Sequence, residues 1–175
     1  MPIDKIEKLP QSMGDDGIRE TLLKMRELIY NTDKNRIVKE KARQLIKDIS
    51  PLDYEKQIEV IFRWVTNNVK YVRDIRGVEE LTSPDIIIEN IEKKQETHSS
   101  DCDDIAMLLS ALLRAVGFKT RLEAIALHNN IAYDHARVSV LNPKTNKWIA
   151  LEGTTKDKPI GFRFQSKREI IGLEV

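Results

Sequence analysis

The chain contains one cysteine, Cys102, and a histidine and a carboxylate follow it in separate extended segments. Cys102 lies in the polar run Ser99–Asp104, directly before the apolar run Ile105–Leu109, where a helix is expected to begin. Aligned peptide dipoles and free N–H groups at a helix N-terminus favour the thiolate. His135 and Glu152 come later in the chain. A cysteine, a histidine and a carboxylate in this order indicate nucleophilic catalysis.

Each of the three residue types has a defined task in such chemistry. A free thiol ionises near about pH 8.5, so a histidine must take its proton and later protonate the leaving group. A carboxylate behind the histidine fixes its tautomer and stabilises the imidazolium. The Cys102 backbone N–H is placed to donate to an oxyanion. Asp101, Asp103 and Asp104 oppose the thiolate, and we expect them mainly to cap the helix while the imidazolium dominates at closer range.

The segments that carry the histidine and the glutamate are predicted to form one β-hairpin. Asn142–Thr145 is a strong turn signal between the two strands. If Leu141 pairs with Asn146, His135 lies directly opposite Glu152. Facing residues point to the same side of a sheet with Cβ atoms about 4.5–5.5 Å apart, whereas a one-residue slip places them on opposite faces.

Other readings of these residues remain open. A lone cysteine is often a small buried hydrophobic residue, although the polar neighbours of Cys102 favour catalysis. The aspartates around it could also serve a metal-dependent hydrolase, but consecutive carboxylates suit helix capping better, and we expect no metal or other cofactor. His98 and His128 are expected in solvated loops.

The bulk composition is that of a globular domain, with 175 residues, 41% hydrophobic, 33% charged and a formal net charge of +1. This charge points to neither nucleic acid nor an anionic membrane as a partner. One cysteine makes no internal disulfide, which fits a reducing, cytoplasmic setting. The first residues contain no apolar signal segment, and no apolar run reaches the about 18 residues of a membrane helix. The oligomeric state stays open.

Helices are expected to dominate the first two thirds of the chain and strands the remainder. Residues 1–16 read as a loose leader, 17–52 as a helical extension and 53–175 as the core of a single domain. Ser83 and Pro84 start one helix, and Asp101 caps the helix that ends before Gly117. The expected helices begin near Ile18, Asp33, Asp53, Pro84 and Cys102; the expected strands are 121–127, 135–141, 147–152 and 161–164. This order predicts an α+β fold with the Cys102 helix packed on an antiparallel sheet.

Three blocks of the sequence resemble the transglutaminase-like superfamily of papain-fold cysteine enzymes, in particular its short bacterial and phage-borne members. The blocks are Asp101–Arg121, Asp134–Val138 and Trp148–Thr154, and the upstream runs Asn67–Asp74 and Val78–Pro84 resemble the family's lead-in. The resemblance spans about residues 54–155.

The resemblance implies that Cys102 is the nucleophile, His135 the base and Glu152 the orienting acid. The chain differs from the family pattern at four positions: the family usually has glycine at Ser100, an aromatic residue at Arg137, aspartate at Glu152 and proline at Gly153. Candidate oxyanion or substrate-binding residues are Gln95, Tyr71, Asp101 and Arg137.

The resulting hypothesis is a cysteine-dependent acyl-transfer enzyme acting on amide bonds of a protein or peptide substrate. Water as the acceptor makes it a peptidase or amidase, which the small chain without an evident calcium loop favours. An amine as the acceptor makes it a protein-glutamine transglutaminase. A catalytically inactive binding or assembly module is the third possibility.

Overall fold

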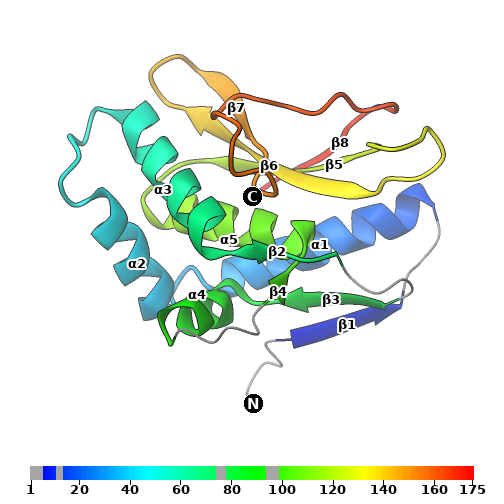
Figure 1. The fold of residues 1–175 in the computed structure, drawn as a ribbon, viewed down its shortest axis with the longest axis horizontal. Helices are drawn as coiled ribbons and strands as arrows, with labels where there is room; N and C mark the ends of the chain where they lie inside the picture. Colours follow the sequence, from blue (N-terminus) through cyan, green and yellow to red (C-terminus); the bar gives the residue numbers. More distant parts are fainter. Residues whose placement is uncertain (1–5, 11–13, 74–77, 94–98) are drawn as a thin grey trace.

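A four-stranded antiparallel sheet covers one side of a central helix in the computed structural model (Figure 1). The structure describes residues 6–10, 14–73, 78–93 and 99–175. The strand order is β7-β6-β5-β8. The strands are β5 Thr120–Ile125, β6 His135–Asn142, β7 Lys147–Leu151 and β8 Ile171–Glu174. The α+β fold expected from the order of the elements is confirmed.

The central helix is α5, Cys102–Ala115, and it packs against β5 and β6 on one side and against the other helices elsewhere (Figure 1). These are α1 Asp15–Asn31, α2 Arg36–Ile46, α3 Tyr54–Asn68 and α4 Pro84–Glu92. Residues 104–113 are therefore buried on every face of α5. The sequence predicts a single core face for this helix; the structure shows a helix enclosed by protein all round, as expected of one hydrophobic on all sides.

Two small sheets complete the fold. Strand β1, Ile6–Pro10, pairs antiparallel with β3, Val78–Thr82, so part of the expected loose leader is a strand. Strand β2, Lys70–Tyr71, pairs in parallel with β4, Ser99–Ser100. The β2–β4 pair places Tyr71 opposite Ser100, two residues before Cys102. None of the helices in the described part of the chain is long and apolar enough to cross a bilayer.

Two of the expected elements are wrong in position. Helix α2 starts after Asn35, whose side chain accepts from the Ile37 N–H at 2.8 Å, whereas Asp33 pairs with Arg114 at 2.9 Å. The expected strand at 161–164 is irregular, and the fourth strand of the sheet is β8. The cause lies at Phe164, because its backbone N–H and carbonyl bond to buried side chains instead of a neighbouring strand.

The expected register of the β6–β7 hairpin is wrong by two residues. Leu141 pairs with Trp148 instead of Asn146, and the turn is 143–146. The Asn142 side chain fixes this turn by accepting from the N–H groups of Lys144 and Thr145, and Asn146 has a φ of 54°. Because side chains in a strand alternate with period two, a two-residue shift leaves every side chain on its expected face.

Gly153 follows β7 and lies directly against α5. A Cβ atom at this position would clash with Ile105 Cγ2 and lie 2.9 Å from Leu109 Cδ1. We expect Gly153→Ala to lower the free energy of unfolding by about 1–3 kcal/mol, because the end of β7 must move away from the helix. Urea denaturation measures the change. Gly172→Ala is the control, since its Cβ meets the flexible Arg121 side chain at 3.1 Å, and an equal loss in both variants would contradict the argument.

Candidate active site

Cys102 is the first residue of α5, and the start of this helix is fixed by its neighbours. The Asp101 side chain accepts from the Asp104 N–H at 3.0 Å, which confirms Asp101 as the N-cap. Asp104 is buried, and its Oδ1 accepts from the Thr82 N–H at 2.7 Å, so the helix start is also tied to β3. These contacts hold the half-buried Cys102 thiol against the hydrophobic core.

The surroundings of Cys102 favour the neutral thiol. Burial raises the pKa of Cys102 well above its ordinary value, and the Asp103 and Asp101 carboxylates raise it further. The thiol donates to Asp103 Oδ1 at 3.6 Å. A hydrogen bond from the Ala136 backbone N–H opposes the rise in pKa. Burial and the two nearby carboxylates therefore oppose the helix N-terminus, which by itself favours the thiolate.

His135 and Glu152 form a buried pair at the start of β6 and the end of β7. His135 Nε2 lies 2.9 Å from Glu152 Oε2, with 6% of the histidine side chain and 0% of the glutamate side chain exposed. An ionised carboxylate only accepts hydrogen bonds, so Nε2 donates and Nδ1 is the basic nitrogen. The two residues lie close, as the sequence predicts, although by the observed register Glu152 follows Leu151 and so faces Arg137 more directly than His135.

Glu152 is held as a carboxylate by three hydrogen bonds. Burial alone would raise the pKa of Glu152, but the bonds from His135, Arg137 and the Phe164 N–H lower it below its ordinary value. Arg137 Nη1 donates to Oε1 at 3.0 Å, and the Phe164 N–H donates to the same oxygen at 3.0 Å. Both oxygens of Glu152 are thus engaged, with Oε2 facing the histidine.

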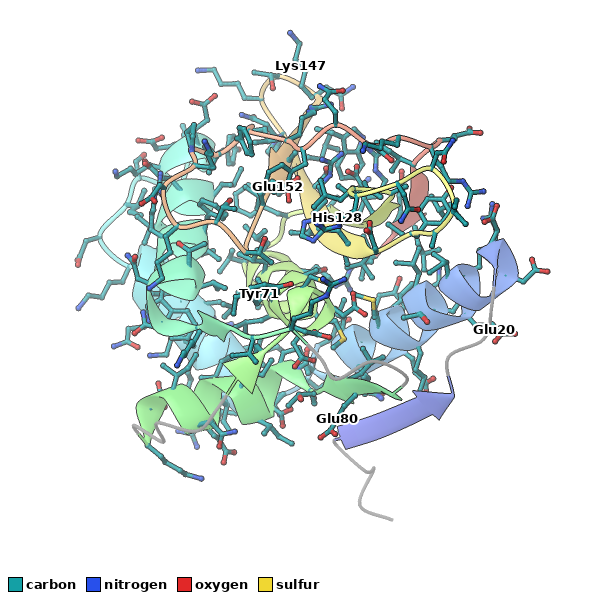
Figure 2. All side chains as sticks on the ribbon, turned by 45° about the vertical axis from the view of Figure 1, so that its right-hand side comes forward. Glu20, Tyr71, Glu80, His128, Lys147 and Glu152 are labelled. Carbon is teal, nitrogen blue, oxygen red and sulfur yellow. The ribbon has the colours of Figure 1, made fainter. Side chains whose placement is uncertain are left out.

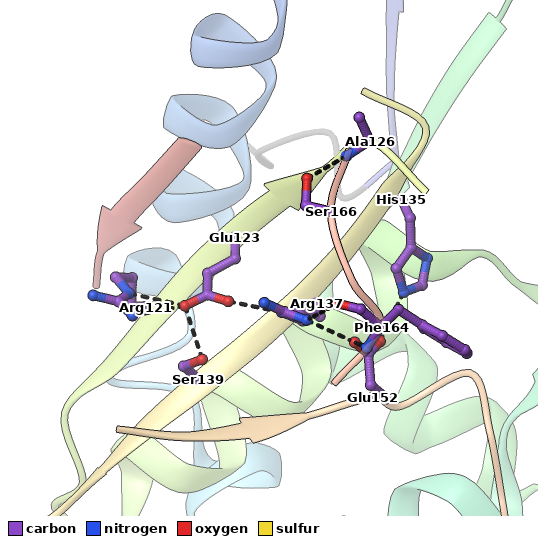
Figure 3. A network of polar contacts seen from close by, with 9 residues as sticks. All are labelled: Arg121, Glu123, Ala126, His135, Arg137, Ser139, Glu152, Phe164 and Ser166. Atoms are coloured by element: carbon purple, nitrogen blue, oxygen red, sulfur yellow. Dashed lines mark hydrogen bonds and ion pairs between the residues drawn. The ribbon is translucent and has the colours of Figure 1, made fainter. Parts of the chain in front are cut away.

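A chain of buried charges continues from Glu152 through Arg137 to Glu123 (Figure 3). Arg137 Nε donates to Glu123 Oε2 at 2.7 Å. Arg121 and Ser139 donate to the other oxygen of Glu123 at 2.7 Å and 2.9 Å. Burial would raise the pKa of Glu123, but these partners lower it. Sequence reasoning missed Glu123; its signal was a charged residue within an otherwise buried strand, opposite Arg137 in the β5–β6 pairing.

The segment that links β7 to β8, Glu152–Ile170, crosses over the His135 side chain. The rings of Phe164 and His135 meet edge to face, with centroids 5.9 Å apart at an angle of 79°. Ser166 accepts from the Ala126 N–H, and the Lys167 N–H donates to the Ala126 carbonyl, so this segment is bound to the end of β5. Phe164, which no sequence signal singled out, thereby restricts the imidazole from one side.

Tyr71 lies at the other border of the site, beside α5 and below the sheet that carries Glu152 (Figure 2). Tyr71 is 43% exposed. Burial and the neighbouring Cys102 raise the pKa of Tyr71, so the phenol is a proton donor near the thiol. A groove of about 320 Å³ is lined by Tyr71 and by residues from the end of α3, from β2 and from the segment after β7: Thr66, Asn67, Asn68, Val69, Lys70, Gly153, Thr154 and Lys156.

The structure places the remaining candidate residues in different surroundings. Arg137 is 2% exposed, and its guanidinium pairs with the carboxylates of Glu123 and Glu152. A direct contact of Arg137 with substrate or an oxyanion stays a prediction. Asp101 caps α5. Gln95 and His98 lie outside the described residues. His128 is exposed and hydrogen bonded to Asp134 at 2.6 Å. Among the described residues, no group of three or more His, Cys, Asp or Glu side chains could hold a metal ion.

The lowered pKa values of Glu123 and Glu152 predict a loss of stability in acid. A carboxyl group with a lowered pKa in the folded state binds fewer protons there than in the unfolded state. Its stabilising contribution is therefore present above its ordinary range, about pH 4–4.5, and is lost as the pH falls towards the folded-state pKa. We expect the free energy of unfolding to fall steadily below about pH 5, measured by urea denaturation at each pH.

The matched variants for this pH dependence are Glu123→Gln and Glu89→Gln. Glu123→Gln is expected to reduce the slope with pH, since one of the carboxyl groups with a lowered pKa no longer titrates. Glu89 forms an exposed pair with Lys93, so Glu89→Gln is expected to leave the slope unchanged. Equal slopes for Glu123→Gln and the parent chain would contradict the assignment.

The family of the chain follows from a comparison with protein-family models. The model described as the transglutaminase-like superfamily matches residues 39–153. The match covers more than half of the chain, and the chain therefore belongs to the transglutaminase-like superfamily. Members of this superfamily are generally cysteine-dependent enzymes. No curated protein sequence matches the chain.

Solved structures that are similar to this chain have low sequence identity to it, and the first of them shares the fold. A "putative protease" from Parabacteroides distasonis is 14% identical with a TM-score of 0.52, covering 75% of this chain and 25% of that one. A "putative cysteine protease" from Cytophaga hutchinsonii is 15% identical with a TM-score of 0.48, covering 97% and 63%. A third structure, "a TGase", is 12% identical with a TM-score of 0.41, covering 90% and 37%. This chain spans less than two thirds of each of these longer proteins.

Proposed function

We propose that this chain is a thiol acyl-transfer enzyme that acts on an amide bond of a protein or peptide, with hydrolysis as its main reaction. The observation that carries the proposal is the buried His135–Glu152 pair beside the start of α5. The Ala136 N–H, one residue after this histidine, bonds to the Cys102 sulfur, so the thiol and the pair border one site.

The reaction starts from a neutral thiol, because the surroundings of Cys102 disfavour the thiolate. His135 Nδ1 takes the proton from Cys102 as the sulfur attacks the carbonyl carbon of the amide. The C–N bond then breaks, the imidazolium gives its proton to the leaving amine, and a thioester remains. Water attacks the thioester, again with His135 as the base, and releases the acid and the free thiol. Glu152 stays ionised throughout and stabilises the imidazolium.

The substrate is proposed to occupy the groove that Tyr71 lines. The groove borders Gly153, which follows the triad glutamate, and it carries polar side chains from Asn67, Thr154 and Lys156. Tyr71 is proposed to donate from its phenol to the oxyanion, together with the Cys102 backbone N–H. An amine that enters the same groove would replace water as the acceptor, which is the transglutaminase alternative.

The proposal is tested with p-nitrophenyl acetate, an activated ester that reports acylation of a thiol without knowledge of the natural substrate. We expect a burst of p-nitrophenolate equal to the enzyme concentration, followed by slow turnover, with the acetyl group on Cys102 by mass spectrometry. Cys102→Ala is expected to show no burst. A parent chain whose Cys102 reacts no faster than free cysteine at neutral pH would favour the inactive binding module. Incorporation of dansylcadaverine into a glutamine peptide, at a rate above hydrolysis, would favour the transglutaminase.

A further inference from the structure

We propose that Arg137 is a positioning residue, which holds Glu152 in the orientation and charge state that serve His135. The inference rests on the proposed function, because the state of His135 matters to the reaction only if His135 is the base. Arg137 does not touch the groove or the thiol among its recorded contacts; it acts through Glu152.

The two carboxylate oxygens of Glu152 have different partners, Arg137 for one and His135 for the other. Nη1 donates to Glu152 Oε1 at 3.0 Å, while Oε2 faces His135 Nε2 at 2.9 Å. With Oε1 fixed by Arg137, the carboxylate plane is set and Oε2 is directed at the imidazole. The same Nη1 donates to the Phe164 carbonyl at 3.1 Å, so Arg137 also fixes the segment whose ring packs against His135.

Because these side chains are buried, their protonation states depend on how well the neighbouring charges compensate one another. The side chain of Arg137 is 1% exposed and that of Glu152 is 0% exposed. Without the Arg137 cation the buried His135–Glu152 pair would take up a proton more readily, and a His135 that is already protonated cannot act as a base. Arg137 supplies the cation while His135 is neutral, which is the state in which the histidine must act as a base.

Glu123 explains why a guanidinium can remain buried at this position. It accepts from Arg137 Nε at 2.7 Å, and its side chain is 4% exposed. The planar guanidinium therefore spans two carboxylates, one on β5 and one at the end of β7, through different nitrogens. A lysine ammonium carries the same charge but lacks this fork geometry.

The charged groups around the His135–Glu152 pair come from three elements. Their charges determine whether a substitution makes proton uptake by the pair easier or harder. Arg137 on β6 bonds to Glu152, and Glu123 on β5 bonds to the other side of the Arg137 guanidinium. Cys102 and Asp103 are on α5, where Cys102 bonds to the Ala136 N–H next to His135. The segment after β7 contributes the Phe164 backbone. Removing the Arg137 cation makes proton uptake by the His135–Glu152 pair easier, and removing the Glu123 anion makes it harder.

The experiment measures the titration midpoint of His135 by NMR of its imidazole carbon–proton pairs in the full chain. The chain has three histidines, so the His135 signal is identified by its loss in His135→Ala. We expect Arg137→Met to raise the midpoint by about one pH unit, a tenfold change in proton affinity, and Glu123→Gln to lower it. Arg137→Lys, which keeps the charge, is expected to restore most of the parent midpoint.

The matched control is Arg121→Met, because Arg121 also bonds to Glu123 but is 33% exposed and makes no recorded contact with Glu152. Its midpoint shift is expected to be less than half of that of Arg137→Met. A purely structural Arg137 would alter stability and leave the midpoint in place, so an unchanged midpoint in folded Arg137→Met overturns the proposal. If Arg137→Met does not fold, an unchanged midpoint in Glu123→Gln overturns it equally.

The same variants separate this inference from the proposed function. When the rate of acylation by p-nitrophenyl acetate is plotted against pH, the midpoint of its acidic limb is expected to shift in each variant in the same direction as the NMR midpoint of His135. If the variants show the expected midpoint shifts but the parent chain shows no acylation of Cys102, the role of Arg137 stands and the enzyme proposal fails. If acylation occurs and the midpoints do not move, the enzyme proposal stands and the role of Arg137 is overturned.

Discussion

Replacing His135 by alanine is expected to slow acylation of Cys102 by p-nitrophenyl acetate about 100- to 10,000-fold at neutral pH. The reason is the resting state of the thiol. Burial and the Asp103 and Asp101 carboxylates raise the pKa of Cys102 well above its ordinary value, so little thiolate forms without a base. His135, held by Glu152, is the base proposed to take the proton during attack. The measurement is the rate of the p-nitrophenolate burst under single-turnover conditions.

His128→Ala is the matched control for the loss of an imidazole. His128 lies seven residues earlier, is exposed and bonds to Asp134, so its removal leaves the buried pair untouched. Its burst rate is expected to stay within about twofold of the parent chain. A His135→Ala chain that acylates as fast as His128→Ala would exclude general-base catalysis by His135.

The helix that carries Cys102 could be predicted from local sequence alone. An N-cap aspartate before an apolar run and a glycine at the end are signals that act within a few residues of the chain. The structure has α5 at Cys102–Ala115 with the Asp101 cap and Gly117 at a φ of 96°. The direction of the Cys102 pKa could not be predicted in the same way, because it depends on burial and on how far the aspartate side chains lie from the sulfur.

The hairpin shows which part of a sheet a sequence can determine. Alternation of side chains predicts that His135 and Glu152 lie on the same face of the sheet. This prediction holds despite the two-residue error in register, because the side-chain period is two. The register itself depends on the turn, where the Asn142 side chain and the positive φ of Asn146 select a loop one position further along. The consequence is chemical, because the observed register brings Glu152 into contact with both His135 and Arg137.

The buried charges on β5 and β6 could not be predicted from composition or periodicity. Glu123 and Arg137 lie fourteen residues apart, and their contact follows from the pairing of β5 with β6. The family usually has an aromatic residue where this chain has Arg137, so in the sequence this arginine only weakens the match to the family pattern. In the structure the same arginine compensates two buried carboxylates. The error at 161–164 has the same origin, since Phe164 bonds to these side chains and the fourth strand forms later, at β8.

Glu152→Ala is expected to lower the free energy of unfolding by about 3–5 kcal/mol. The substitution leaves Arg137 with one carboxylate instead of two and removes the partners of His135 Nε2 and the Phe164 N–H, all in buried or half-buried positions. Loss of one member of a buried ion pair costs this much because the remaining charge stays desolvated. Since a domain of this size is stable by about 5–15 kcal/mol, this loss leaves only about 0–2 kcal/mol if the parent chain lies at the lower end of that range. Urea denaturation followed by circular dichroism measures the change.

Glu152→Gln separates the charge of this residue from its shape. The amide keeps an acceptor for Arg137 or the Phe164 N–H, so the loss of stability is expected to be smaller than for Glu152→Ala. Its effect on the p-nitrophenyl acetate burst is nevertheless expected to be large, because an amide neither fixes the Nε2–H tautomer by charge nor stabilises the imidazolium. A Glu152→Gln chain that unfolds like the alanine variant but acylates Cys102 at the parent rate would assign Glu152 to the core of the fold and remove it from the reaction.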